Sequence, residues 1–246
     1  MKLTRKRGFY EKYVKRILDI ICSLLAIVVF GWLYVIIAVM VRLKMGKPVI
    51  FKQPRPGLID EHTGHERVFN MYKFRTMTDE RDSNGNLLPN EQRLPKFGKW
   101  LRSTSLDELP EVFCILKGDM SIIGPRPQLV RDMVFMTDQQ RMRHTAKPGL
   151  SGLAQVKGRN AITWEDKINW DLKYIEHVSF MGDLKLVLET VKVALVKQEG
   201  ITDGENATAL DYGDALLKCG RVSREKYEAL QAQARNLITE HGKIGK

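Results

Sequence analysis

The residues with the clearest chemical potential lie in one stretch, residues 105–127. Two adjacent carboxylates, Asp107 and Glu108, stand near its start, and Arg126 stands between two prolines at its end. An ionised carboxylate can act as a nucleophile or as a metal ligand. An arginine between two prolines presents a planar, permanently charged fork from a stiff loop, which suits phosphate recognition. The stretch therefore predicts a site for a phosphorylated ligand.

The intervening residues predict the element that positions the carboxylates. Ser105 followed by Glu108 matches a capping box, and Gly118 stands where a left-handed helix C-cap is expected. We therefore predict one helix over residues 105–117. Its positive end would keep Asp107 ionised near neutral pH and would favour a phosphate beside it. The plainer interpretations are that the two acids only cap a helix and that the arginine is a solvated turn residue.

Charge is distributed unevenly along the chain. The net charge is +11, and residues 1–55 carry 12 of the 40 Lys and Arg residues but two of the 29 acidic residues. The basic excess therefore flanks a hydrophobic segment, where attraction to anionic lipid accounts for it. The rest of the chain is close to neutral, so we expect no nucleic-acid partner. The mean hydropathy of −0.27 excludes a polytopic membrane protein.

An apolar segment follows a basic start. Residues 1–17 mix lysine and arginine with aromatic residues, as interfacial segments do, and no small-residue cleavage site follows, so we expect them to be retained. Residues 20–41 carry no charge over about 33 Å of helix, enough to cross a ~30 Å hydrocarbon core. Positive charge on both flanks opposes a single span, and a re-entrant hairpin would bend at Gly31-Trp32. Composition leaves both topologies open.

Cationic segments precede the acidic pair. Val49 to Lys52 and Val68 to Phe74 predict two strands separated by a polar, turn-rich piece. Strand periodicity places Lys73 and Arg75 on one face, where they either bind phosphate or are simply exposed. The basic amphipathic residues 97–103 bring Arg102 toward the acidic pair.

Segments after the acidic pair complete the predicted domain. Glycines within residues 147–160 permit close backbone approach to a ligand, with Arg159 as the candidate contact, although a plain turn explains them too. Thr163 with Asp166 predicts a capped helix to about Glu176, and Ser223 predicts the start of a final helix. We expect the polar tail that holds this last helix to serve in packing or association.

Neither cysteine nor histidine spacing predicts a metal site. The three cysteines share no metal or redox spacing, and we interpret them as buried thiols in a reducing compartment. Residues 80–91 nearly fit a calcium-loop pattern, but a proline interrupts it and its first ligand is Glu instead of Asp. We predict an exposed loop with an Asn-Gly turn there.

Several ordered motifs resemble those of the bacterial sugar transferase family, and more narrowly those of the small monotopic phosphoglycosyl transferases. They are residues 73–77 (KFRTM), 102–110 (RSTSLDELP), 117–127 (KGDMSIIGPRP), 147–149 (KPG) and 155–160 (QVKGRN). The similarity extends over about residues 10–200.

The resemblance implies a magnesium-dependent enzyme that transfers a sugar 1-phosphate from a UDP-sugar to undecaprenyl phosphate and releases UMP. This is the first membrane step in assembling a glycoconjugate such as a polysaccharide, a capsule or a glycoprotein glycan. The resemblance implies that Asp107 is the nucleophile of a covalent aspartyl phospho-sugar intermediate, that Glu108 is its dyad partner, and that both hold the metal. It also implies four cationic residues for the substrate phosphates: Lys73, Arg102, Arg126 and Arg159.

The implied fold is α+β and predominantly helical, with a re-entrant membrane helix hairpin, a small cytoplasmic catalytic domain and interfacial amphipathic helices. We predict four regions: a basic interfacial segment (1–17), the re-entrant helix (18–45), the catalytic domain (46–200) and a C-terminal tail with a helix (201–246). The implied location is the bacterial inner membrane, in contact with membrane lipid, with the catalytic domain on the cytoplasmic face. A homodimer is left open. Gly31-Trp32 replaces the Ser-Pro that many members have at the bend.

A non-catalytic, membrane-anchored scaffold protein is the alternative. That hypothesis predicts no magnesium-dependent UDP-sugar chemistry and predicts tolerance of substitutions at Asp107 and Arg126. The sequence does not identify the sugar under the transferase hypothesis.

Overall fold

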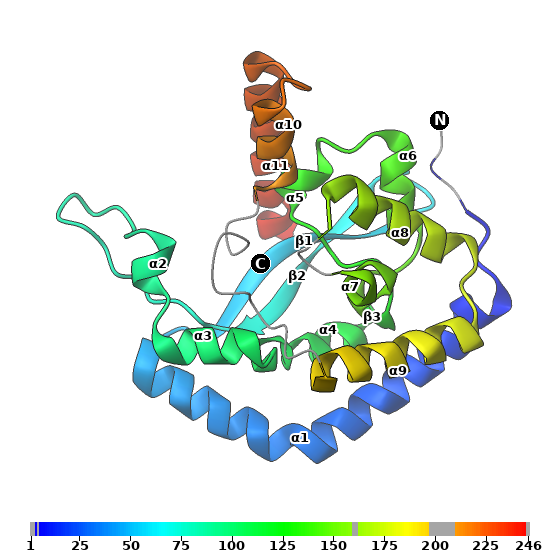
Figure 1. Ribbon diagram of the computed structural model, residues 1–246, viewed down its shortest axis with the longest axis horizontal. Helices are drawn as coiled ribbons and strands as arrows, with labels where there is room; N and C mark the ends of the chain where they lie inside the picture. Colours follow the sequence, from blue (N-terminus) through cyan, green and yellow to red (C-terminus); the bar gives the residue numbers. More distant parts are fainter. Residues whose placement is uncertain (1–2, 4, 159–161, 197–209, 245–246) are drawn as a thin grey trace.

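The computed structural model describes residues 3, 5–158, 162–196 and 210–244. These residues are mostly helical, and their strands form two small sheets (Figure 1). Strands β1 (Ile50–Ile59) and β2 (Glu66–Phe74) pair antiparallel, whereas β3 (Ser121–Ile123) and β4 (Gly149–Ser151) pair parallel. The predicted α+β, predominantly helical class is confirmed.

The helices are listed here in chain order, with η marking a short π- or 3₁₀-helix. They are η1 (Tyr10–Val14), α1 (Lys15–Met45), α2 (Asn90–Arg93), α3 (Lys96–Ser103), η2 (Leu106–Glu108), α4 (Glu111–Lys117), α5 (Val130–Met133), α6 (Asp138–Arg141), η3 (Met142–Thr145), α7 (Leu153–Lys157), α8 (Trp164–Glu176), α9 (Phe180–Val196), α10 (Tyr212–Lys218) and α11 (Arg224–Ile244).

The longest element is α1, which contains no proline to interrupt its helical hydrogen bonds. It is one continuous helix, and Figure 1 shows it bent near its middle along the lower edge of the molecule. The chain does not reverse within it as in a hairpin. Together with η1 it forms the one helix in the described part of the chain that is long and apolar enough to cross a membrane. Its exposed apolar side chains include Leu24, Leu25, Val28, Val29, Phe30, Trp32, Val35 and Ile36.

Both ends of α1 contact the same folded domain. Near its start, the Asp19 carboxylate accepts hydrogen bonds from the Ser121 hydroxyl and the Ile122 backbone N–H, both at 3.0 Å. Near its end, Val41 is fully buried in a hydrophobic core that includes Phe74 of β2. The exposed apolar middle therefore lies between two anchored ends.

The first sheet is longer than predicted. The sequence indicates a strand that ends near Lys52 and a turn-rich piece from Pro54 onward, but β1 continues through Pro54 and Pro56 to Ile59. Both strands of a two-stranded sheet are edges, so a proline can stand where its missing N–H would face away from the partner. This two-stranded sheet carries Arg55 on β1 and Lys73 on β2.

The predicted helix over residues 105–117 is divided in two. The segment forms η2 and α4, because Pro110 between them cannot donate a helical hydrogen bond. Ser105 adopts a left-handed conformation with φ 55° and makes no side-chain cap, so the predicted capping box is wrong. The left-handed C-cap at Gly118 is confirmed, with φ 94°. Asp107 and Glu108 therefore lie in a tight turn before α4.

The glycines after Lys147 approach the backbone of the protein itself. A Cβ atom on Gly149 would lie 2.1 Å from the Gly124 backbone nitrogen, and one on Gly152 would lie 2.1 Å from the Gly124 carbonyl oxygen. The expectation that these two glycines make room for a ligand is wrong, because the β3–β4 contact occupies that space.

The C-terminal helices are confirmed and pack on the domain. Thr163 caps α8 by accepting from the Asp166 N–H at 3.1 Å, and Ser223 accepts from the Lys226 N–H at the start of α11. Figure 1 shows α10 and α11 rising together from the sheet beside α5. The sequence did not indicate α10. Ala234 of α11 is buried in a core with Val130 of α5, which is consistent with the packing role expected for the tail.

The cysteines are all free thiols, but the prediction that all three are buried is wrong. Cys114 is buried within α4, whereas Cys22 is exposed on α1 and Cys219 is exposed at the end of α10.

We predict that Gly149→Ala destabilises the fold. Its Cβ would collide with the Gly124 backbone, and overpacking of this kind costs about 1–3 kcal/mol. The thermal unfolding midpoint of the purified protein should fall by several degrees, whereas Gly8→Ala, which meets no atom within 4 Å, should leave it unchanged. Equal midpoints for the two variants would contradict the close β3–β4 contact.

Candidate active site

The acidic pair lies within a cluster of cations. Glu108 Oε1 accepts from Lys73 Nζ at 2.7 Å and from Arg126 Nη2 at 2.6 Å. Lys73 comes from β2 and Arg126 from the loop after β3, so one carboxylate joins three separate segments. The structure therefore brings Lys73, Arg126 and Glu108 together.

Asp107 is the buried member of the acidic pair, with 8% of its surface exposed. Among the described residues, none forms a hydrogen bond or ion pair with its carboxylate. Burial and the adjacent charge of Glu108 raise the pKa of Asp107 to about 6, although Lys73, Arg102 and Arg126 oppose the shift. The helix-terminus argument predicts a shift in the other direction and is wrong here. The carboxylate is still mostly ionised at pH 7.

Glu108 has the opposite electrostatic balance. Burial alone would raise its pKa, but the charges and hydrogen bonds of Arg126 and Lys73 outweigh burial and lower the pKa to about 2. Glu108 in turn raises the pKa of the Arg126 guanidinium, which stays protonated. Glu108 therefore remains anionic and holds both cations beside Asp107.

Glu111 is a third carboxylate that the sequence analysis did not identify. It is 1% exposed, and its Oε1 lies 3.2 Å from Lys73 Nζ. Burial and the charge of Glu108 raise its pKa to about 7. The signal for it was its position three residues after Glu108, which brings two acids to one side of a helical turn.

Arg55 is a second residue that the sequence analysis missed. It is half-buried, it donates from Nη1 to the Pro127 carbonyl at 3.0 Å, and its Nε has no partner among the described residues. Burial and the nearby charge of Arg126 lower the pKa of Arg55 to about 10. The available signal was a repeated pattern, because Arg55 and Arg126 each stand between two prolines.

The other predicted cations have different positions. Arg102 of α3 donates from Nε to Thr76 Oγ1 at 2.9 Å, and its charge lowers the pKa of Asp107, so it belongs to the site. Arg75 follows the end of β2, pairs with Asp79 and donates to the Met77 carbonyl at 2.8 Å, away from Glu108. Lys73 and Arg75 are therefore not brought together. Arg159 lies outside the described residues.

A buried ion pair fixes the backbone that carries Arg126. Arg143 is fully buried and pairs with Asp171 of α8 at 2.5 Å. The same guanidinium donates from Nη2 to the Arg126 carbonyl at 2.6 Å. Arg126 is therefore held through its side chain by Glu108 and through its backbone by Arg143.

The acidic pair suits a magnesium ion whose remaining ligands are substrate phosphates and water. Within the described residues, no group of three or more His, Cys, Asp or Glu side chains could hold a metal ion. Mg²⁺ in phosphate chemistry is usually held by one or two carboxylates together with substrate phosphates and water. In the described part of the chain, Asp107 has no ion-pair partner and Glu108 Oε2 accepts no hydrogen bond. The carboxylate oxygens of Asp107 and Glu108 are therefore ligands of the kind that Mg²⁺ prefers.

Comparisons with known proteins identify the family of this chain. The chain matches the bacterial sugar transferase family over residues 10–197. It is 46% identical over 196 residues to the uncharacterized sugar transferase EpsL of Bacillus subtilis, covering 80% of this chain and 94% of that protein.

Two further relatives carry more specific names. The UDP-glucose:undecaprenyl-phosphate glucose-1-phosphate transferase of Klebsiella pneumoniae is 38% identical, over 72% of this chain and 39% of that protein. The undecaprenyl-phosphate galactose phosphotransferase of Salmonella typhimurium is 32% identical, over 75% of this chain and 41% of that protein. The chain thus spans less than half of these two proteins but nearly all of EpsL. The family match over most of its length and the identity to these relatives show that the chain belongs to the bacterial sugar transferase family.

Proposed function

We propose that this protein transfers a sugar 1-phosphate from a UDP-sugar to undecaprenyl phosphate and releases UMP, as the first membrane step of glycoconjugate assembly. Relatives named as undecaprenyl-phosphate sugar phosphotransferases support the reaction class. The observation that carries the proposal is a buried carboxylate, Asp107, without an ion-pair partner in the described chain, beside a cationic cluster that Glu108 holds in place.

The proposed reaction has two displacement steps at one phosphorus atom. In the first, an Asp107 carboxylate oxygen bonds to the phosphorus that carries the sugar, and the bond from that phosphorus to the bridging oxygen breaks. UMP leaves with the electron pair. In the second, a phosphate oxygen of the lipid bonds to the same phosphorus, and the bond to Asp107 breaks, which restores the carboxylate. Two displacements replace one difficult transfer between anions.

The cations counter the repulsion between an anionic nucleophile and an anionic diphosphate. Arg126 is permanently charged and 38% exposed at its side chain, so it can contact a phosphate while it remains bonded to Glu108. Lys73 and Arg102 place two further charges near Asp107. Stabilisation of this kind is the main contribution that a protein makes to phosphoryl transfer. The same charges would receive the lipid phosphate in the second step.

Magnesium is part of the proposal. Asp107 and Glu108 would hold it together with the donor phosphates, and when bound it would neutralise charge that develops on the phosphate oxygens. The protein's own residues orient the nucleophile and supply the remaining positive charge.

The apolar surface supports attachment to a membrane. Both ends of α1 contact one domain and both flanks of its apolar run are basic, which suits a helix that enters the bilayer and returns to the same face. The α9 helix, which is drawn above α1 in the lower part of Figure 1, also exposes apolar residues: Phe180, Met181, Leu184, Leu188 and Val191. We place this surface in the cytoplasmic leaflet of the bacterial inner membrane.

We expect Asp107→Asn to abolish turnover, because an amide oxygen is a poor nucleophile and carries no charge. UMP release with magnesium, a UDP-sugar and undecaprenyl phosphate should fall on the order of 10³-fold or more. Asp119→Asn, an exposed change at the other end of α4, should retain activity. A panel of UDP-sugars in this assay would also identify the donor.

The thermal midpoint of Asp107→Asn should match that of the unchanged protein, which separates lost chemistry from lost folding. An active Asn variant would overturn the nucleophile assignment. Absence of UMP release from the unchanged protein with every donor would favour the non-catalytic scaffold.

We expect the first displacement to depend on pH through Asp107. Its raised pKa of about 6 means that the anionic form is lost as the pH falls below 6, so the rate should drop about tenfold per pH unit there and level off above. The burst of UMP measured without lipid isolates this step from titration of the lipid phosphate, whose second pKa is also about 6. A plateau that extends down to about pH 4, as for an ordinary aspartate, would contradict the buried nucleophile.

We expect both flanks of α1 to lie on one side of the membrane. In chains that carry Cys22→Ser and Cys219→Ser, Lys6→Cys and Lys47→Cys should both react with an impermeant maleimide in inside-out vesicles, and neither should react in intact spheroplasts. A chain that retains Cys219 provides the reference for the C-terminal helices, which pack on the folded domain. Labelling of the two flanks from opposite sides would show a single span instead.

A further inference from the structure

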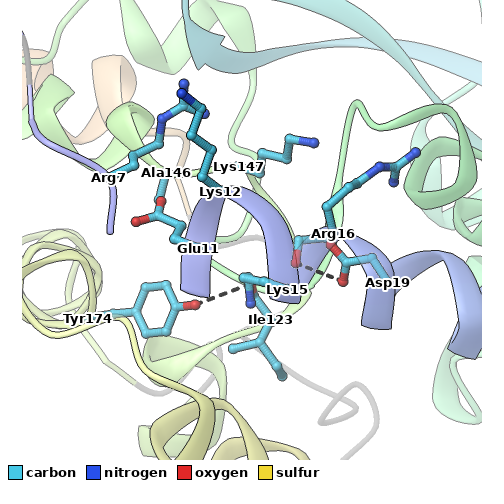
Figure 2. Close-up of a pocket in the computed structure, with 11 residues that line it drawn as sticks. Arg7, Glu11, Lys12, Lys15, Arg16, Asp19, Ile123, Ala146, Lys147 and Tyr174 are labelled. Carbon is cyan, nitrogen blue, oxygen red and sulfur yellow. Dashed lines mark hydrogen bonds between the residues drawn. The ribbon is translucent and has the colours of Figure 1, made fainter. Parts of the chain in front are cut away.

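A second concentration of cations surrounds a cavity at the start of α1. The cavity has a volume of about 90 Å³, well above the ~10–15 Å³ that one water needs. Figure 2 shows basic side chains around it from both walls: Arg7, Lys12, Lys15 and Arg16 from the N-terminal segment, and Lys147 from the segment before β4. Two carboxylates also line it, Glu11 and Asp19.

Internal contacts already satisfy several of these groups. Lys15 pairs with Asp183, and the Arg16 guanidinium donates to the Ile115 and Leu116 carbonyls at 2.6 and 2.7 Å. These bonds fix the cavity wall, and they leave the charge of Arg16 without a counter-ion among the described residues.

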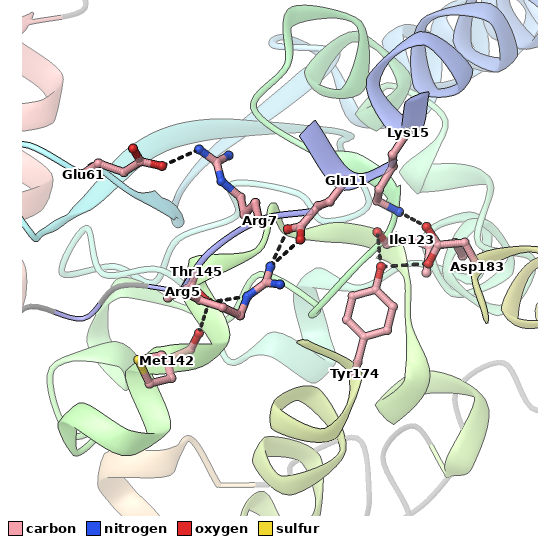
Figure 3. A network of polar contacts seen from close by, with 10 residues as sticks. All are labelled: Arg5, Arg7, Glu11, Lys15, Glu61, Ile123, Met142, Thr145, Tyr174 and Asp183. Carbon is pink, nitrogen blue, oxygen red and sulfur yellow. Dashed lines mark hydrogen bonds and ion pairs between the residues drawn. The ribbon is translucent and has the colours of Figure 1, made fainter. Parts of the chain in front are cut away.

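The two lining acids are also engaged. Glu11 accepts from Arg5 at 2.5 and 2.6 Å, as Figure 3 shows, and Asp19 accepts from Ser121 and Ile122. Donors of the protein itself therefore already balance part of the negative charge of these two carboxylates.

Lys147 has no carboxylate partner within the described part of the chain. Its ammonium is partly buried, and burial together with the like charges of Arg16 and Arg7 lowers its pKa. Lys12 likewise makes no ion pair with a described residue and lies over the Tyr13 ring at 5.5 Å. An anion in the cavity would supply the missing counter-charge to both lysines.

The helix that forms one wall has two faces. Lys12, Lys15, Arg16 and Asp19 follow a helical repeat and face the cavity. A separate face exposes four large side chains at intervals of four residues: Phe9, Tyr13, Ile17 and Ile21. Such a helix at a bilayer surface presents apolar side chains to acyl chains and cations to headgroups.

The cavity wall is also joined to α9, which has exposed apolar residues of its own. The Lys15–Asp183 pair and the Tyr10 hydroxyl, which donates to Asp183 at 2.7 Å, join the cavity wall to the first turn of α9. Phe180 and Met181 are exposed at that turn. Exposed apolar residues therefore lie both on the helix of the cavity wall and on the adjoining first turn of α9.

We propose that this cavity binds the phosphate headgroup of an anionic phospholipid, with Lys147 and Lys12 as its direct contacts and Arg16 as a supporting charge. The site lies at the C-terminal end of α4, where Arg16 meets the Ile115 and Leu116 carbonyls, whereas Asp107 and Glu108 precede the N-terminal end. It is thus separate from the candidate active site and does not depend on the proposed transferase activity.

The test measures lipid binding to the full-length protein in a neutral detergent, which presents no charged surface. Native mass spectrometry would count bound short-chain phosphatidylglycerol, with short-chain phosphatidylcholine and inorganic phosphate as the comparison probes. We expect one tightly bound phosphatidylglycerol. We also expect weaker phosphatidylcholine binding, since the cavity cations repel choline, and weaker inorganic phosphate binding, since it has no acyl chains.

Lys147→Gln should weaken phosphatidylglycerol binding about tenfold or more, as expected when hydrogen bonds to a charged group are lost. Lys12→Gln provides a second variant on the exposed side of the cavity, in case the first does not fold. Lys6→Gln is the matched control, because Lys6 is an exposed lysine of the same basic segment outside the cavity.

Equal loss in Lys6→Gln and in the cavity variants would show attraction to the basic segment as a whole and would overturn the proposal. Equal binding of phosphatidylglycerol and phosphatidylcholine would overturn the requirement for an anionic lipid. Inorganic phosphate that binds as tightly as phosphatidylglycerol would show a site for free anions instead of lipid.

Discussion

The candidate site depends on the two ion pairs that the Glu108 carboxylate makes with Lys73 and Arg126. Glu108 receives Lys73 from β2 and Arg126 from the loop after β3, while its own backbone belongs to the turn that carries Asp107. Three segments distant in sequence thus meet at one oxygen atom. Removing a partner from a buried pair leaves an uncompensated charge, which is costly, so the acid and its two cations stabilise one another. Arg143 fixes the Arg126 backbone independently.

The three carboxylates near this point have different environments. Glu108 is held below its ordinary pKa by two cations, whereas burial raises the pKa values of Asp107 and Glu111. Neighbouring acids with separated pKa values are typical of sites that assign them different tasks. Here Glu108 organises positive charge, and Asp107 remains free of direct partners among the described residues.

Residue types predicted the members of the candidate site better than its geometry. The adjacent acids and the arginine between prolines identified three members, because charge and backbone restriction are properties of local sequence. The ion pair of Glu111 with Lys73 of β2 depends on tertiary packing, which the local spacing of the acids does not encode. The sequence led to the expectation that the glycines near β4 make room for a ligand. A glycine indicates that some atom approaches the backbone closely, but the sequence does not tell which atom it is. Helix α10 is short, and its packing against α5 and α11 determines it more than its own pattern does.

The helix α4 links the two charged sites. Its seven residues span about 10 Å, with the acidic pair before its first turn and Arg16 of α1 bonded to the carbonyls near its last. A phospholipid headgroup beside Arg16 would therefore set the height of α4, and so of Asp107, relative to the bilayer surface. The far end of α1 packs against Phe74, next to Lys73 on β2, which fixes a second point of the same domain. Under the proposed function, two anchored points and the helix between them would constrain the distance between Asp107 and a lipid phosphate at the membrane.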